Sequence, residues 1–190
     1  MRKILVILIL TALGMISPTL VLGQSKSDVL IKNATVMTAV KGTLENTDIL
    51  IQNGKIAKIG KNLSASATTR VINAEGQYVT PGIIDCHSHT MLDAINEGVY
   101  SVTSMTRTRD VLNPTDIAIY RALAGGVTVA NLLHGSANPI GGQNTTVKFK
   151  WGHPVEDYPI PDAPPGIKFA MGENVKRSTS FAQPGATVRY

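Results

Sequence analysis

Short runs of aliphatic and β-branched residues, separated by turn-forming residues, fill the first part of the chain and predict β-strands. Asn53-Gly54 separates two of these runs and favours a type I′ hairpin turn, because both residues tolerate a positive φ. The segment 24–80 is therefore predicted to be a small β-sandwich-like domain with a structural role. Its predicted strands cover residues 29–31, 35–37, 49–51, 56–59 and 70–72.

After residue 80 the pattern changes to strands that alternate with a helix. Residues 83–84 form a short apolar run typical of a buried strand, and residues 126–133 form a longer one. Between them, Asn113 and Pro114 suit the start of a helix, and Gly125 suits its end. A strand, a helix and, after a short turn, a second strand predict two adjacent parallel strands.

Composition narrows the class of protein. The 190 residues are 43% hydrophobic and 16% charged, which is typical of a globular protein with a real core. The net charge of +5 includes Arg2 and Lys3, and the remaining basic residues are scattered, so nucleic-acid binding is not supported. Cys86 is the single cysteine, so no disulfide can form within the chain.

The N-terminus has the features of a secretory signal peptide. Two basic residues precede the apolar stretch 4–16, and small or compact residues end at Gly23, where cleavage is predicted. Pro18 interrupts the apolar run short of the length of a comfortable membrane span, although an uncleaved anchor is the alternative. The mature protein is expected to be exported, to the periplasm if the source is a diderm bacterium, without stable membrane association.

The segment PGIIDCHSHT carries the candidate chemistry. Residues two apart on a strand share a face, so Asp85, His87 and His89 are predicted to project the same way. Two neutral imidazoles on one face can bind one metal ion, and their nitrogens suit zinc and its neighbours. Asp85 is either a further ligand or a partner that orients an imidazole. The alternative is an incidental H-x-H in a protein that binds no metal.

A strand that ends in Asp-x-His-x-His, reached through Val-Thr-Pro-Gly, resembles the first barrel strand of the amidohydrolase superfamily. Ala-Gly-Gly-Val-Thr followed by Gly-Ser-Ala-Asn-Pro is similar to imidazolonepropionase-like and related exported amidohydrolases. The resemblance implies an α/β fold, a partial (β/α)8 TIM-type barrel over residues 81–190, and one or two divalent ions, zinc first among them. It also implies hydrolysis of a carbon-nitrogen bond, an amide or cyclic amide, in a small molecule.

Within this resemblance, residues 145–151 and 166–171 would be the third and fourth barrel strands. In a common amidohydrolase subtype, a lysine near the end of the fourth strand is carboxylated by carbon dioxide and bridges two metal ions; Lys168 matches that position. Glu173 is the competing bridging ligand. His134, at the end of the second strand, is a further candidate for metal or substrate contact, with a structural role as the alternative.

Two loops are also candidates for contacts with a small molecule. Arg107 and Arg109 follow the histidine strand on the face where barrel enzymes carry their sites, and an arginine there could hold a carboxylate. A solvated surface loop is the alternative. The Gly-rich residues 134–143 are expected to form a loop that lacks the spacing of a phosphate-binding motif.

The length of the chain limits the resemblance. Complete amidohydrolases have eight barrel strands, with further metal-binding histidines after the fourth, and such a barrel takes about 250 residues. The chain is therefore predicted to be an N-terminal fragment whose activity alone is in doubt. The alternatives are an inactive truncated product, or an exported binding module with an incidental H-x-H. The only partner expected is the small-molecule substrate. The sequence does not decide whether the chain forms an oligomer.

Overall fold

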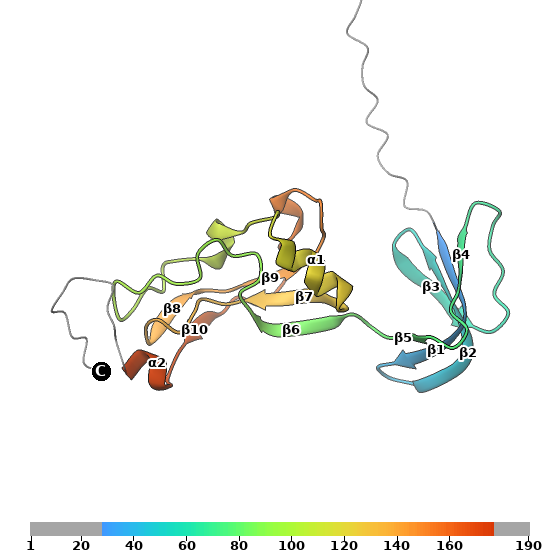
Figure 1. Cartoon of the computed structure of the whole chain (residues 1–190), viewed down its shortest axis with the longest axis horizontal. Helices are drawn as coiled ribbons and strands as arrows, with labels where there is room; N and C mark the ends of the chain where they lie inside the picture. The colour runs from blue at the N-terminus through green and yellow to red at the C-terminus, as the bar shows by residue number, and fades with distance from the viewer. Residues whose placement is uncertain (1–27, 177–190) are drawn as a thin grey trace, which may run out of the picture. The chain divides into compact units, whose positions relative to one another are not determined.

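The computed structural model of the chain describes residues 28–176, so the predicted signal peptide lies outside the described residues. The chain divides into two compact units between Thr80 and Pro81. Each unit is described by itself (Figure 1). Over the described range, none of the helices has both the length and the apolar character needed to cross a membrane.

The first unit is one five-stranded sheet with the order β3-β2-β1-β4, in which β5 pairs with β1. β2 and β3 run antiparallel to their neighbours, whereas β4 and β5 run parallel to β1. The prediction of a sandwich is thus replaced by a single hydrogen-bonded sheet. The strands are β1 (Val29–Thr38), β2 (Gly42–Gln52), β3 (Lys55–Gly60), β4 (Arg70–Asn73) and β5 (Tyr78–Val79).

The turn between β2 and β3 is the one that the sequence predicts. Asn53 has φ 51° and Gly54 has φ 74°, the two positive angles that a type I′ turn requires. Because this turn fixes the register, Ile49 pairs with Ile59 across the hairpin. Ile49 is buried with Ala34 of β1, so the register sets the core of this unit.

The second unit contains two small sheets. One has the order β6-β7-β9, and the other pairs β10 with β8. Its strands are β6 (Ile83–Ser88), β7 (Val127–Leu132), β8 (Ile140–Gln143), β9 (Thr145–Lys148) and β10 (Ile167–Phe169). Its helices are α1 (Ile117–Ala124) and α2 (Glu173–Lys176), with short 3-10 turns at Thr108–Val111 and Val155–Asp157.

The predicted strand-helix-strand unit is present. β6 and β7 are parallel neighbours, and α1 connects them in sequence (Figure 1). α1 ends at Ala124 and Gly125 caps it, as the sequence predicts. Its start differs from the prediction: Asp116 is the N-cap in place of Asn113, because its Oδ1 accepts a hydrogen bond from the Ala118 backbone N–H at 2.9 Å.

The predicted third and fourth barrel strands are not where a parallel barrel would have them. β9 runs antiparallel to β7, and β10 pairs antiparallel with β8 in the other sheet. β8 itself comes from the end of the Gly-rich stretch that was expected to be a loop. The described residues therefore form a mostly-sheet α/β structure with few helices.

One buried cluster joins α1 to the sheet on which it packs. Ile119 of α1, Leu132 of β7, Val147 of β9 and Tyr158 are each 0% exposed. The Tyr158 hydroxyl is not left unpaired, since it donates to the Lys150 carbonyl at 2.8 Å. This cluster holds β7 in place between β6 and β9.

We expect Asp116→Ala to destabilise the second unit by about 1–3 kcal/mol, because the variant loses two hydrogen bonds. Asp116 Oδ1 caps α1, and Oδ2 accepts from the Met91 backbone N–H at 2.8 Å, in the loop after β6. Urea unfolding measures the change in free energy. Asp116→Asn keeps one acceptor oxygen and should lose less, whereas equal stability of Asp116→Ala and the parent chain would contradict the prediction.

Candidate active site

His87 and His89 lie at the end of β6. β6 ends at Ser88, so His87 is on the strand and His89 directly follows it. The centroids of the two rings are 5.4 Å apart with an interplanar angle of 85°. The rings are therefore neighbours in an edge-to-face arrangement, on the side of the strand where the sequence predicts them to lie together.

A backbone carbonyl fixes the orientation of His89. Its Nδ1 lies 2.8 Å from the Leu133 carbonyl oxygen, just beyond the end of β7. A carbonyl can only accept, so Nδ1 carries the proton and the lone pair is on Nε2. This is the arrangement in which a histidine presents one nitrogen to a metal while the other donates to the protein. The parallel pairing of β6 and β7 supplies it, because Leu133 N–H also donates to Ser88 O at 3.0 Å.

Lys168 reaches the same place from the other sheet. Its Nζ lies 3.4 Å from His87 Nε2, although the two residues are 81 positions apart in sequence. The Lys168 side chain is buried, with 9% of its surface exposed. Over residues 28–176, no ion pair joins this ammonium to a carboxylate. The structure thus brings together three of the predicted site residues, His87, His89 and Lys168.

The surroundings favour the neutral form of His87. Desolvation lowers the pKa of His87 below its usual 6.5, and the positive charges of Lys168 and His89 lower it further, whereas Asp85 acts in the opposite direction. A neutral imidazole is the form that can bind a metal. The direction of this shift is therefore compatible with a ligand role.

The remaining predicted site residues have other contacts. Asp85 Oδ1 accepts from the His87 backbone N–H at 3.1 Å, so it supports the local backbone. His134 is buried, and both of its ring nitrogens are engaged: Nε2 accepts from Glu97 N–H at 2.7 Å and Nδ1 lies 2.8 Å from Gly135 O. In this conformation His134 has no lone pair left for a metal.

Glu173 and Lys168, the two competing bridging residues, line one cavity of about 320 Å³. Ser136 and Phe169 also contribute to its wall. The cavity therefore leaves both candidates within reach of a small ligand. Among the described residues, no group of three His, Cys, Asp or Glu side chains forms a metal-ligand cluster, so the constellation consists of two imidazoles and a lysine.

Sequence reasoning missed the groups that hold these residues in place. The Leu133 carbonyl carries no side-chain signal, and only the parallel pairing of β6 with β7 predicts a contact near it. Asn131 Nδ2 donates to Cys86 O at 3.4 Å, and Asn144 Nδ2 donates to Asn131 Oδ1 at 2.6 Å. These amides connect β6, β7 and the start of β9 beside the histidines.

Comparisons with known proteins fit this fold and site. An amidohydrolase of Hapsidospora irregularis is 32% identical over 82% of this chain and 20% of its own length. The D-hydantoinase of Geobacillus stearothermophilus is 53% identical over 32% of the chain and 12% of its own length. The crystal structure of an amidohydrolase from Thermotoga maritima covers 79% of the chain and 40% of that protein, with 39% identity and a TM-score of 0.70.

The β6-α1-β7 unit carries an H-x-H pair at the end of its first strand. The protein is therefore an α/β protein with a candidate metal centre at the end of β6. The chain belongs to the amidohydrolase superfamily. It spans 20% of the length of the curated relative from H. irregularis and 40% of the T. maritima structure. No family model matches the sequence. Membership of the imidazolonepropionase-like group stays a prediction.

Proposed function

We propose that the protein is a metal-dependent hydrolase, or part of one, that cleaves a carbon-nitrogen bond of an amide or cyclic amide. The observation that carries the proposal is the convergence of His87, His89 and Lys168 from two separate sheets. Relatives named D-hydantoinase and dihydroorotase support a cyclic amide as substrate. The β6-α1-β7 unit would be the start of a (β/α)8 barrel, and the N-terminal stretch would export the protein.

The donor set fits a divalent metal. His89 presents Nε2 because Leu133 O holds the proton on Nδ1. The lone pair of His87 Nε2 faces the Lys168 ammonium at 3.4 Å and would be released to a metal once the lysine nitrogen carries a carbamate. Two imidazole nitrogens suit zinc and its first-row neighbours. When bound, such an ion would lower the pKa of water and polarise a carbonyl. Asp85 would hold the backbone of His87 in position.

Lys168 would link the two histidines to a second ion. Its neutral amine would form a nitrogen-carbon bond to carbon dioxide and release a proton, so a buried cation becomes a carbamate anion. An ammonium beside a divalent metal would be unfavourable, because like charges repel at short distance. A carbamate at Nζ removes that repulsion and supplies two oxygen ligands. Glu173, in the same cavity, is the alternative bridge.

We expect the zinc-loaded chain to incorporate labelled carbon dioxide at Lys168. With 13C-bicarbonate, 13C NMR of the parent chain should give a carbamate signal, and Lys168→Ala should give none. The same samples are assayed for opening of hydantoin and dihydrouracil, where metal-dependent turnover in the parent chain should fall by more than about 100-fold in Lys168→Ala.

Lys148→Ala is the matched control, since Lys148 is an exposed lysine on β9. It should keep the carbamate signal. A signal that survives in Lys168→Ala would contradict the assignment of the carbamate. A zinc-loaded chain that gives no signal would leave Glu173 as the bridging residue, which Glu173→Gln tests by its loss of bound metal.

A further inference from the structure

Two asparagines connect the two sheets of the second unit. Asn144 lies between β8 and β9, and its backbone N–H donates to Gly166 O, directly before β10, at 3.0 Å. Its Nδ2 donates to Asn131 Oδ1 on β7 at 2.6 Å. Asn131 Nδ2 in turn donates to Cys86 O on β6 at 3.4 Å. We call Asn131 and Asn144 the asparagine pair, and it connects the start of β10 to β6.

The two ends of this connection lie beside the contact between the lysine and the histidine. Gly166 is two residues before Lys168 in the chain, and Cys86 directly precedes His87. The Nζ of Lys168 lies 3.4 Å from Nε2 of His87. The asparagine pair and this contact therefore join the same two stretches of chain, so the separation of β10 from β6 at the site depends on both.

The Cys86 carbonyl fixes the orientation of both amides. A carbonyl oxygen can only accept, so the NH2 group of Asn131 faces Cys86 and its Oδ1 faces Asn144. The NH2 group of Asn144 must then face Asn131, because an amide oxygen there would have no proton to donate. This is the one orientation of the two amides that completes the connection.

This orientation leaves one polar atom of Asn144 without a partner. Its Oδ1 is buried and accepts no hydrogen bond from any residue in the range 28–176. A buried acceptor without a donor is unfavourable for folding, so an apolar side chain of the same shape would suit this position better. Stability alone therefore does not explain an asparagine here, whereas the hydrogen bond that its NH2 group donates does.

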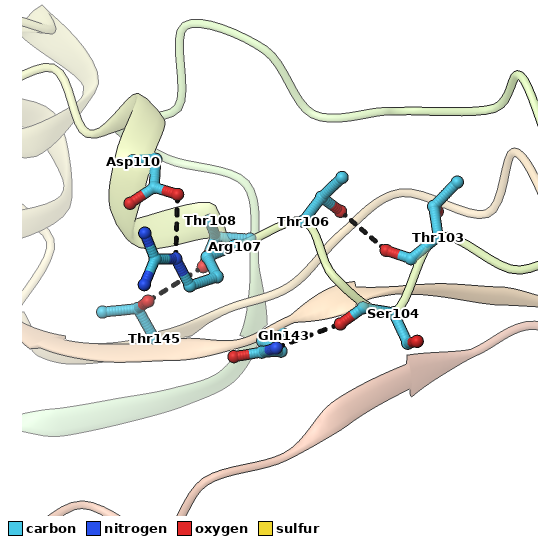
Figure 2. A network of polar contacts seen from close by, with 8 residues as sticks. All are labelled: Thr103, Ser104, Thr106, Arg107, Thr108, Asp110, Gln143 and Thr145. Carbon is cyan, nitrogen blue, oxygen red and sulfur yellow. Dashed lines mark hydrogen bonds and ion pairs between the residues drawn. The ribbon is translucent and has the colours of Figure 1, made fainter.

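Hydrogen bonds on both sides hold the backbone of Asn144 in place. Before it, Gln143 Nε2 donates to Ser104 O at 3.0 Å. After it, Thr145 Oγ1 lies 3.1 Å from Thr108 Oγ1, and Figure 2 shows both contacts. The loop before α1 thus fixes the residues that flank Asn144. Its side chain therefore extends from a fixed point toward β7, and the direction of the amide is set.

The contact with Lys168 sets the tautomer of His87. An ammonium can only donate, so Nε2 of His87 must accept and the proton of the neutral ring is on Nδ1. In water a neutral imidazole prefers the opposite tautomer, with its proton on Nε2. A metal binds the lone pair of the nitrogen that carries no proton, and the hydrogen bonds of the ring decide which nitrogen that is. The tautomer of His87 therefore depends on how closely β10 approaches β6.

We propose that Asn131 and Asn144 are positioning residues. They hold β10 at the distance from β6 at which Lys168 meets His87, and they thereby keep the Nε2 lone pair of His87 free of a proton. The use of this lone pair by a metal rests on the proposed function. The tautomer of His87 in the metal-free chain does not, because it requires neither an ion nor turnover.

The test replaces both asparagines by leucine, which has nearly the same shape and no hydrogen-bonding group. Long-range 1H–15N NMR of the metal-free 190-residue chain, at a pH at which the ring is neutral, reports which nitrogen of His87 carries the proton. His87→Ala assigns the signals. The parent chain should carry the proton on Nδ1. Asn131→Leu, Asn144→Leu and the double variant should each carry it mainly on Nε2.

Zinc affinity and stability are measured in the same variants. Each single variant should bind zinc at least about tenfold more weakly, the usual loss for a residue that orients a ligand. The double variant should lose no more than either, because both changes break one connection. Its urea midpoint should not fall, since replacement of both partners by apolar groups of the same shape is nearly neutral. A purely structural role predicts the reverse, a lower midpoint with an unchanged tautomer and zinc affinity.

Asn73→Leu is the matched control, because it breaks an asparagine-asparagine hydrogen bond of the first unit. There Asn33 Nδ2 donates to Asn73 Oδ1 at 2.9 Å. This variant should leave the tautomer of His87 and the zinc affinity unchanged. Asn144→Ala removes the same donor as Asn144→Leu with a smaller side chain, and it provides the answer if leucine prevents folding.

An unchanged His87 tautomer in a folded Asn144 variant, or an equal change in Asn73→Leu, would overturn the proposal. So would losses of zinc affinity that multiply to about 100-fold in the double variant, since they would mean that the two asparagines act separately. A parent chain that binds no zinc, together with the expected change of tautomer, would refute the proposed function and leave the positioning role standing. Zinc binding by the parent chain without a change of tautomer in the variants would refute the positioning role alone.

Discussion

Replacement of both His87 and His89 by alanine is expected to lower the zinc affinity of the chain by more than about 100-fold. Loss of a residue that merely orients a metal ligand already costs about 10- to 100-fold, and this variant removes two direct ligands. Metal analysis by mass spectrometry, after loading with zinc and desalting, measures the retained ion per chain. The parent chain should retain zinc, and the variant should not.

His153→Ala is the control for this experiment. His153 is an exposed histidine whose Nδ1 lies 3.0 Å from Asp157 Oδ2. Its replacement by alanine removes an imidazole and leaves β6 unchanged. It should retain as much zinc as the parent chain. Equal zinc retention by the double variant would refute the metal centre. Circular dichroism of the metal-free proteins separates this result from a loss of fold, since His87 is exposed and its ring is not part of a buried cluster.

Local sequence signals predicted the parts of the fold that depend on a few neighbouring residues. Asn53-Gly54 forms the predicted turn because its two positive φ values are a property of those residues. The pairing of His87 with His89 follows from the two-residue period of a strand. The parallel pairing of β6 with β7 follows from the crossover through α1 that joins these two apolar strands.

Contacts between distant segments decided the parts that the sequence did not predict. Position 141 in β8 needs glycine because a Cβ there would be 2.5 Å from His134 Nδ1. The glycine therefore allows close packing of a strand and does not mark a flexible loop. Asn144 alone separates β8 from β9, and no residue pattern in residues 145–151 specifies that β9 runs antiparallel to β7. Lys168 and His87 lie in different sheets, so no local pattern predicts their contact. Only the place of Lys168 in the predicted fourth strand suggested that it belongs to the site.

Leu132→Ala should destabilise the second unit by about 2–5 kcal/mol, the range for a large-to-small change in a packed core. Leu132 is 0% exposed and packs in the cluster that includes Ile119 and Val147. It also pairs with Ser88 of β6 and with Thr145 of β9, so the substitution leaves a void in the middle of this sheet. Urea unfolding measured through the buried Tyr158 reports the loss.

Ile83→Ala is the matched aliphatic control on the neighbouring strand. Ile83 is 55% exposed on β6, and the loss of so exposed a side chain should change the free energy of unfolding by less than about 0.5 kcal/mol. A loss in Ile83→Ala as large as in Leu132→Ala would mean that another surface covers β6 in solution. A loss below about 2 kcal/mol in Leu132→Ala, the lower end of the range for such core truncations, would contradict the packing of β7 between α1 and β9. Because Leu133 O holds the His89 ring, zinc affinity should also fall in Leu132→Ala and stay unchanged in Ile83→Ala.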